Sequence, residues 1–288
     1  MTGARGFRQE LVALFGQPVD ENPTQAMIEA AFRAADLDWR YLTIEVAPEG
    51  LADAVRGLRA MGMRGANCTI PHKVAVMEHL DAIAPEARAI GAVNCIVNEN
   101  GRLTGHNTDG RGFLASLCAV ADPAGQQVVI LGAGGAARAI GVELALAGAR
   151  SITIVNRSAE RGRALARHLA SAGARANFLP LAGDLRLPAG TGIFVNATSI
   201  GLHPDAGAHV PLVFDTLRPN LVVADVIPNP PRTRLVREAT ARGCTVLDGL
   251  GMLVNQGVIG FHLWTGADPD PQVMRAALEE IFGAPTHA

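Results

Sequence analysis

Short apolar runs alternate with amphipathic segments along almost the whole chain. In the first third, the apolar runs predict strands, and the segments between them carry apolar residues at helical spacing. The predicted strands are Leu11–Phe15, Tyr41–Val46, Gly65–Ile70 and Ala92–Val97, and the predicted helices are Pro23–Ala35 and Leu51–Met61. Strands that alternate with helices predict βαβ units and a mainly parallel sheet.

The pattern restarts near Arg111 with longer and more apolar strands. These are expected at Val128–Leu131, Ser151–Val155, Ile193–Asn196, Leu221–Asp225 and Thr245–Leu247. Continuous apolar runs such as VVIL are typical of parallel strands that are buried on both faces. Two terminal helices are expected at Gly251–Leu263 and Pro271–Ile281.

The sequence therefore predicts an α/β protein of two domains. Residues 1–110 would form an N-terminal α/β substrate-binding and catalytic domain with a mainly parallel sheet, and residues 111–250 a Rossmann-like, doubly wound nucleotide domain. We expect the join near Leu114–Gly125, the helices of residues 251–288 to pack back on the first domain, and a cleft between the domains.

Composition excludes several classes of protein. The 288 residues are 49% hydrophobic and only 4% aromatic, with a formal net charge of −2, which argues against nucleic acid as a partner. No apolar stretch is long enough to cross a membrane, and the N-terminus lacks the apolar core of a secretory signal. The four cysteines have neither CxxC nor metal-ligand spacing. We expect a cytoplasmic protein with reduced thiols and no metal.

A glycine-rich turn follows the first strand of the second domain. In this setting the glycines permit a tight turn and let backbone N–H groups approach a pyrophosphate, while the helix that follows supplies partial positive charge. The residues expected to hold the phosphates are Gly132, Ala133, Gly134, Gly135 and Ala136. The pattern predicts a dinucleotide cofactor.

The end of the next strand favours NADP over NAD. NAD sites usually place an acidic residue there to accept the ribose 2′-hydroxyl, but this chain has Asn156, Arg157 and Ser158, with Arg161 in the helix that follows. Guanidinium groups match a 2′-phosphate, and each charge-assisted hydrogen bond contributes about 1.5–3 kcal/mol. The alternative is that both arginines only form a solvated helix face.

Lys73 is the single lysine among 25 basic residues, so the other 24 are arginine. It follows a predicted strand on which Asn67 and Thr69 share one face, and ligands of parallel sheets bind at strand carboxyl ends. Asn94 and Asp109 follow neighbouring segments. Such a polar set suits a polyhydroxylated small molecule, and Lys73 could protonate a carbonyl that receives a hydride, with Asp109 keeping the lysine charged. The adjacent His72 is expected to be an exposed bystander in a turn.

The chain resembles the shikimate dehydrogenase family over nearly its whole length. The matching motifs are Asn67–Lys73, Gly91–Asn94, Gly105–Asp109, Gly132–Ala136, Asn156–Ser158 with Arg161, Asn196–Gly201 and Asp248–Gln256. The resemblance implies reversible, NADP-dependent reduction of 3-dehydroshikimate or a close analogue to the ring alcohol.

The resemblance also implies roles for particular residues. Lys73 and Asp109 occupy the positions of the catalytic pair, and Thr69, Asn94 and Gln256 match ligands of the substrate hydroxyls. Positions that line the nicotinamide half of the cofactor in the family are Thr198, Ser199, Val226, Gly249 and Met252. Some members of the family dimerise, so a homodimer is also compatible with the resemblance.

Two positions depart from the family pattern. Members usually hold the substrate carboxylate with two hydroxyl residues near the N-terminus, where this chain has Asn22 and Thr24. Thr24 keeps a hydroxyl, but the Asn22 amide also carries an acceptor that would repel a carboxylate if it turned inward. Pro228 stands where a substrate-contacting tyrosine is common, and the only tyrosine, Tyr41, is expected to pack in the core. We expect altered carboxylate binding.

Several other functions are also compatible with these departures from the family pattern. The first is a quinate or aminoshikimate type of dehydrogenase. The second is a low-turnover paralogue that binds NADP and a small acid as a sensor. A folate dehydrogenase type is disfavoured because position 69, four residues before the lysine, is threonine where that type has tyrosine.

Overall fold

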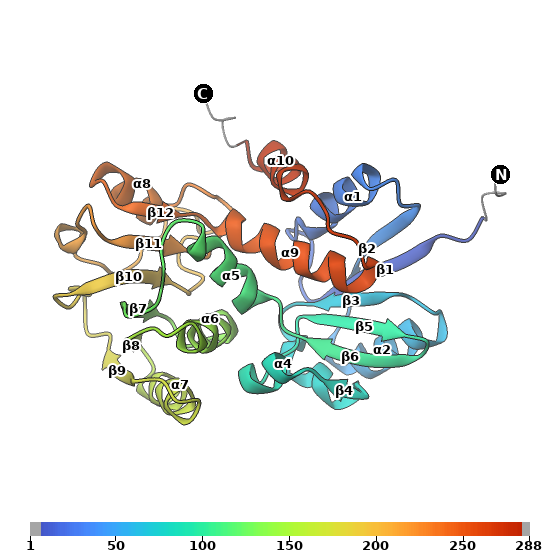
Figure 1. The fold of residues 1–288 in the computed structure, drawn as a ribbon, viewed down its shortest axis with the longest axis horizontal. Helices are drawn as coiled ribbons and strands as arrows, with labels where there is room; N and C mark the ends of the chain where they lie inside the picture. The colour runs from blue at the N-terminus through green and yellow to red at the C-terminus, as the bar shows by residue number, and fades with distance from the viewer. Residues whose placement is uncertain (1–6, 284–288) are drawn as a thin grey trace. The chain divides into compact units, whose positions relative to one another are not determined.

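The computed structural model describes residues 7–283, which form two compact units (Figure 1). The first unit contains the chain up to Thr108 together with Gly257–Ile281, and the second contains Asp109–Gln256. Each unit is built around its own six-stranded sheet. Within residues 7–283, no helix is both long and apolar enough to span a bilayer.

The sheet of the first unit is mixed, with the strand order β2-β1-β3-β5-β6-β4. Its strands are β1 (Glu10–Gly16), β2 (Trp39–Glu45), β3 (Gly65–Cys68), β4 (Ala82–Ile83), β5 (Cys95–Glu99) and β6 (Arg102–His106). β1 pairs in parallel with β2 and β3, and β4 with β6, whereas β5 is antiparallel to both β3 and β6. Three of the five pairings are therefore parallel, as predicted for a mainly parallel sheet.

Helices cover both faces of this sheet. They are α1 (Thr24–Ala34), α2 (Leu51–Ala60), α3 (His72–Ala75), α4 (Pro85–Ile90) and α10 (Pro271–Phe282), with short 3₁₀ turns η1 (Pro48–Gly50) and η2 (Val76–His79). Ala13 and Phe15 of β1 pack in one core cluster with Val55 and Leu58 of α2. Because side chains alternate along a strand, Val12 and Leu14 face the opposite layer.

Helix α9 (Gly249–Thr265) supplies that opposite layer with its C-terminal part. The ring of Phe261 lies 5.3 Å from that of Phe32 in α1. Trp264 donates its indole N–H to the carbonyl of Ile96 at 2.9 Å, and this places the indole directly over Gly65 of β3. The close approach requires a residue without a side chain at position 65.

The sheet of the second unit is entirely parallel, with the order β12-β11-β10-β7-β8-β9. Its strands are β7 (Gln127–Leu131), β8 (Ser151–Asn156), β9 (Ala176–Pro180), β10 (Thr191–Asn196), β11 (Val222–Asp225) and β12 (Thr245–Leu247). This is the doubly wound order, in which the direction of winding switches between β7 and β10. Ligands of such sheets bind beyond the carboxyl ends of the strands at the switch point.

The helices of the second unit are α5 (Asp109–Cys118), α6 (Gly135–Leu146), α7 (Ala159–Ser171) and α8 (Arg234–Ala241), with one 3₁₀ turn, η3 (Phe214–Thr216). The side-chain oxygens of Ser158 and Thr233 accept backbone N–H groups at the starts of α7 and α8, which explains where these helices begin. Leu131, Phe194 and Val223 of the central strands form the core.

The structure differs from the sequence prediction in three ways. Leu114–Cys118 lies inside α5, so the predicted join falls within the second unit. The strand predicted at Ala92 begins only at Cys95, and the one predicted to reach Ile70 ends at Cys68. Strands β4, β6 and β9 were not predicted.

We predict that Gly65→Ala destabilises the first unit. A Cβ atom there would lie 2.1 Å from the Ile96 carbonyl oxygen and 2.5 Å from the Trp264 indole nitrogen. Such overpacking should lower the free energy of unfolding by about 1–3 kcal/mol in urea denaturation. Gly207→Ala is the matched control, because no atom lies within 4 Å of a Cβ there, and an equal loss in both variants would contradict the prediction.

Candidate functional site

The second unit contains a cavity of about 280 Å³ at its switch point. It is lined by Leu131, Gly132, Ala133, Gly134, Asn156, Arg157, Arg161, Leu181, Ala197, Thr198, Ser199 and Ile200. Eight of the residues predicted to bind the cofactor are among these. The other predicted cofactor residues, Gly135, Ala136, Ser158, Val226, Gly249 and Met252, do not line it.

The glycine turn shapes one wall of this cavity. Gly132 has a φ of +117°, and a Cβ there would lie 2.7 Å from the Ala197 carbonyl oxygen, so only glycine fits. A Cβ at Gly134 would meet no atom within 4 Å. The turn is therefore tight where β7 meets the loop after β10 and open in front of helix α6, as a pyrophosphate requires.

The side of the cavity after β8 carries the two arginines. Arg157 and Arg161 are both exposed and both line the cavity. The Ser158 hydroxyl accepts the N–H of Arg161 at 3.3 Å, and the Asn156 amide donates to the Ser158 carbonyl at 3.0 Å. Asn156 and Ser158 thus hold the turn that presents the guanidinium groups.

A buried network organises the loops after β10 and β11. The Asp225 carboxylate accepts hydrogen bonds from the amide of Asn196 at 2.9 Å and the hydroxyl of Thr233 at 2.6 Å. Asn196 in turn accepts the hydroxyl of Thr198 at 2.7 Å. Burial raises the pKa of the Asp225 carboxyl, and these hydrogen bonds oppose the rise. The network fixes Thr198, one of the predicted nicotinamide contacts, and no sequence motif pointed to Asp225.

The remaining predicted residues of the second unit lie around α9 and α5. Gly249 begins α9, where a Cβ would lie 2.2 Å from the Ile227 carbonyl oxygen. Gln256 is 6% exposed and donates to the Leu253 carbonyl at 3.0 Å. Asp109 begins α5 and is 8% exposed.

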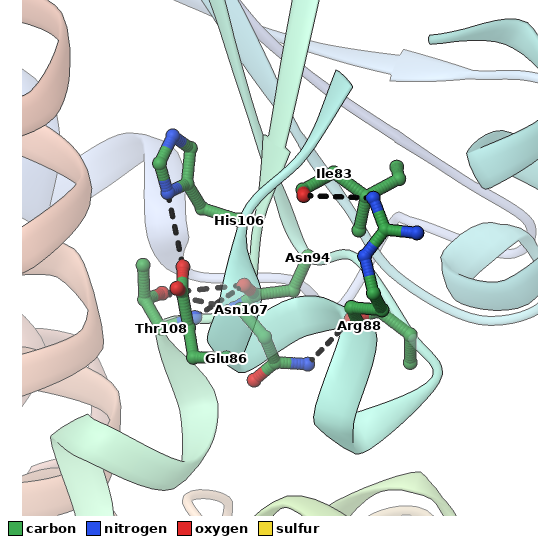
Figure 2. A network of polar contacts seen from close by, with 8 residues as sticks. Ile83, Glu86, Arg88, Asn94, His106, Asn107 and Thr108 are labelled. Atoms are coloured by element: carbon green, nitrogen blue, oxygen red, sulfur yellow. Dashed lines mark hydrogen bonds and ion pairs between the residues drawn. The ribbon is translucent and has the colours of Figure 1, made fainter.

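In the first unit, the predicted substrate amides are held by hydrogen bonds, and Figure 2 shows those of the Asn94 side chain. The Asn94 side chain accepts the backbone N–H of Thr108 at 2.7 Å and donates to its hydroxyl at 3.0 Å. The Asn67 amide donates to the Asn94 carbonyl at 3.0 Å. Asn107, next to Thr108, donates to the Ala92 carbonyl at 3.0 Å. The structure therefore brings Asn67 and Asn94 together and anchors the residue before Asp109.

Lys73 lies in the short helix α3, directly after β3. Its carbonyl accepts the N–H of Val93 at 2.7 Å, so α3 is tied to the segment that carries Asn94. Burial raises the pKa of the Cys68 thiol to about 12, and the positive charge of Lys73 opposes this rise. The positive charge of Lys73 thus reaches Cys68, the last residue of β3 and the neighbour of Asn67. The predicted exposure of His72 is wrong, since it is 1% exposed and bonds the Val46 carbonyl at 2.7 Å.

The start of α1 carries the other two predicted substrate residues. The Asn22 side-chain oxygen accepts the N–H of Thr24 at 3.0 Å, and Thr24 is 4% exposed. The side-chain oxygen of Asn22 is therefore turned onto the chain. Among residues 7–283, no group of three or more His, Cys, Asp or Glu side chains is arranged to hold a metal.

Comparison with protein families gives three matches along the chain. The shikimate dehydrogenase substrate binding domain matches residues 14–96, the shikimate/quinate 5-dehydrogenase model residues 117–198, and the shikimate 5′-dehydrogenase C-terminal domain residues 249–279. A curated shikimate dehydrogenase (NADP+) of Moorella thermoacetica is 46% identical over 278 residues, covering 95% of this chain and 94% of that protein.

Two solved structures are similar over nearly the whole chain. A ligand-free 5-ketofructose reductase of Gluconobacter is 55% identical with a TM-score of 0.91, covering 96% of this chain and all of that one. A shikimate dehydrogenase in complex with NADP+ is 38% identical with a TM-score of 0.90, covering 95% of this chain and 96% of that one. The resemblance predicted from the motifs is thus confirmed, and this chain belongs to the shikimate dehydrogenase family.

Proposed function

We propose that this protein is an NADP-dependent oxidoreductase that reversibly reduces 3-dehydroshikimate, or a close analogue, to the ring alcohol. One observation carries the proposal: the single lysine follows β3 beside two buried amides, Asn67 and Asn94, whose orientations are fixed by hydrogen bonds. Family membership and the curated relatives named as shikimate dehydrogenases support the same activity.

Lys73 is the proposed proton donor. NADPH, when bound, supplies a hydride to the carbonyl carbon, and the lysine ammonium gives its proton to the oxygen that becomes the alcohol. An ammonium also stabilises the negative charge that develops on that oxygen. Asp109 is proposed to keep the lysine charged, and the Thr108 anchor on Asn94 fixes the backbone immediately before it.

The residues proposed to bind the substrate hydroxyls are Asn67, Thr69, Asn94 and Gln256. Asn22 and Thr24 would bind a further polar group of the ring. Side-chain amides can both donate and accept, so they match the hydroxyls of a polyol. The amides of Asn67 and Asn94 are almost fully buried and held in place, so little conformational entropy is lost when a ligand binds.

The cavity of the second unit would hold NADP. Its open glycine turn suits the pyrophosphate, and Arg157 and Arg161 at the end of β8 suit a 2′-phosphate. The residues after β10, with Val226, Gly249 and Met252, are proposed to contact the nicotinamide half.

A second candidate substrate is an uncharged ketone such as 5-ketofructose. The specific observation is the 55% identity to a 5-ketofructose reductase, which exceeds the identity of the shikimate dehydrogenases named above. The exposed Asp20 lies two residues before Asn22, and its charge disfavours a nearby carboxylate. Pro228 removes a hydroxyl that the family commonly offers the substrate.

A cytoplasmic location and a homodimer are also part of the proposal. The first is supported by the buried, reduced thiols of Cys68 and Cys95 and the second by the family resemblance. Quinate and aminoshikimate analogues stay candidate substrates, and a low-turnover NADP-binding paralogue is the non-enzymatic alternative.

Substitution of Lys73 tests the proposed proton donor. Lys73→Ala should lower kcat by about 10²–10⁴-fold because the proton donor is lost, while the Kd of NADPH changes less than about twofold. Lys73→Arg is the matched control, since it keeps the charge but gives up a proton poorly, and its kcat should stay low. Steady-state kinetics and fluorescence titration measure both quantities. A Lys73→Ala enzyme with nearly wild-type kcat would refute the role.

Substitution of the arginines at the cofactor cavity tests the preference for NADP. The wild type should prefer NADPH to NADH by about tenfold or more in kcat/KM. Arg161→Ala should lower kcat/KM for NADPH by about 10- to 100-fold and leave that for NADH nearly unchanged. Arg163→Ala, on the same helix but stacked on Phe178 at 5.7 Å, should leave the preference intact. Equal use of the two cofactors by the wild type would contradict this assignment.

A panel of compounds tests the identity of the substrate. We expect the enzyme to turn over 3-dehydroshikimate. Shikimate, quinate, an aminoshikimate and 5-ketofructose are assayed in parallel. Asn22→Ser should lower KM for the acids, because serine is the residue with which the family usually holds the carboxylate, and should change KM for 5-ketofructose less, because that ketone has no carboxylate. A higher kcat/KM for 5-ketofructose would establish the second candidate. Tight NADP binding without turnover of any compound would favour the alternative that the protein is a low-turnover sensor.

A further inference from the structure

The only tyrosine of the chain is fully buried in the first unit. Tyr41 lies in β2 with an exposed fraction of 0%, and its ring centroid is 6.2 Å from that of Trp264 in α9. The packing predicted for it is therefore present. Its hydroxyl, however, is 2.6 Å from the side-chain oxygen of Asn67, so the residue does more than fill the core.

The sheet register explains how the two side chains meet. Strand β1 lies between β2 and β3, with Val12 opposite Tyr41 and Leu14 opposite Asn67. Because Val12 and Leu14 are two residues apart, they face the same side of the sheet, and so do their partners. The long phenol ring spans the width of β1 and brings its hydroxyl to the amide.

This contact fixes which way the Asn67 amide points. Burial, reinforced by the thiols of Cys95 and Cys68, raises the pKa of the Tyr41 hydroxyl well above its ordinary value, so the group keeps its proton and donates. The amide nitrogen donates to the Asn94 carbonyl at 3.0 Å, which can only accept. A half-turn of the amide would set its oxygen against that carbonyl oxygen. One N–H and one lone pair of Asn67 then stay available in a defined direction.

We propose that Tyr41 is a positioning residue for the reduction, acting through Asn67 to aim its remaining N–H and lone pair at a substrate hydroxyl. The inference rests on the proposed function, because it takes Asn67 as a substrate ligand. An amide that already points at the substrate hydroxyl loses no orientational freedom when the substrate binds, so holding it in place strengthens substrate binding.

The test is a double-mutant cycle with Tyr41→Phe, Asn67→Ala and the pair, assayed with 3-dehydroshikimate and 5-ketofructose. Tyr41→Phe should raise KM for the better substrate by about five- to tenfold, as expected for one lost hydrogen bond, with little change in kcat or in the Kd of NADPH. In the Asn67→Ala background it should change KM less than about twofold, because the group it acts through is gone. Additive effects would overturn the proposal.

Trp264→Phe is the matched control. It also removes one buried hydrogen bond in this layer, the one to the Ile96 carbonyl, but it does not touch Asn67. Equal rises of KM in Trp264→Phe and Tyr41→Phe would mean that general loosening of the layer is responsible, and the proposal would fall. Failure of the wild type to turn over any ketone refutes the proposed function instead, so the two failures are distinguishable.

A readout without substrate keeps the proposal testable if Tyr41→Phe is unstable or inactive. In the unliganded wild type, the side-chain NH₂ of Asn67, assigned by its loss in Asn67→Ala, should rotate and exchange slowly in NMR spectra. Tyr41→Phe should accelerate both processes, whereas the side-chain NH₂ of Asn98, which bonds the Met63 carbonyl at 2.7 Å, should not change. An unchanged Asn67 signal would contradict the proposal.

Discussion

The substrate half of the proposed site depends on Asn94. Its side chain bonds both the N–H and the hydroxyl of Thr108 (Figure 2). Its backbone N–H bonds the His106 carbonyl, and its own carbonyl accepts from the backbone N–H of Cys68 and the amide of Asn67. One residue thus joins the end of β3, the end of β6 and the segment that leads to Asp109. Removing its amide would take away the two hydrogen bonds to Thr108, at a cost of about 1–3 kcal/mol each.

The sequence predicted the second sheet better than the first. Continuous apolar runs gave β7, β10 and β11, because both faces of these strands are buried. It missed β6, although Asn100 and Gly101 both have positive φ and form the two-residue turn that joins β5 to β6. The Asn-Gly pair was the available signal for a hairpin, and it would have revealed the antiparallel part of the sheet. The edge strand β9 is largely exposed, and its side chains gave no alternating pattern.

The site was predictable as a set of residue types but not as a set of contacts. Lys73 and the amides could be found because strand ends in α/β sheets carry ligands. The sequence did not reveal which polar groups serve structure, since some of their partners lie far away in the chain and others are backbone groups of the same turn. His72 bonds a carbonyl 26 residues away and Tyr41 an amide 26 residues away, while Ser158 is used by its own helix. The hydrophobic periodicity of the sequence indicates which side chains are buried and to which face they point. Hydrogen-bond partners depend instead on the register between strands, which the periodicity does not specify.

In the proposed site, fixed charges as well as hydrogen-bond donors would set substrate choice. With its oxygen bound by Thr24, Asn22 presents an N–H group, and such a neutral donor can bind a carboxylate or a hydroxyl with similar geometry. Fixed charges nearby would then add to the discrimination. Asp20 is exposed, and water screens exposed charges, so its repulsion of an acid would be modest and would weaken as salt increases. Within the proposed function, this loop would thus lower the affinity for an acid without excluding it, and the relative rates with acidic and uncharged ketones would depend on ionic strength.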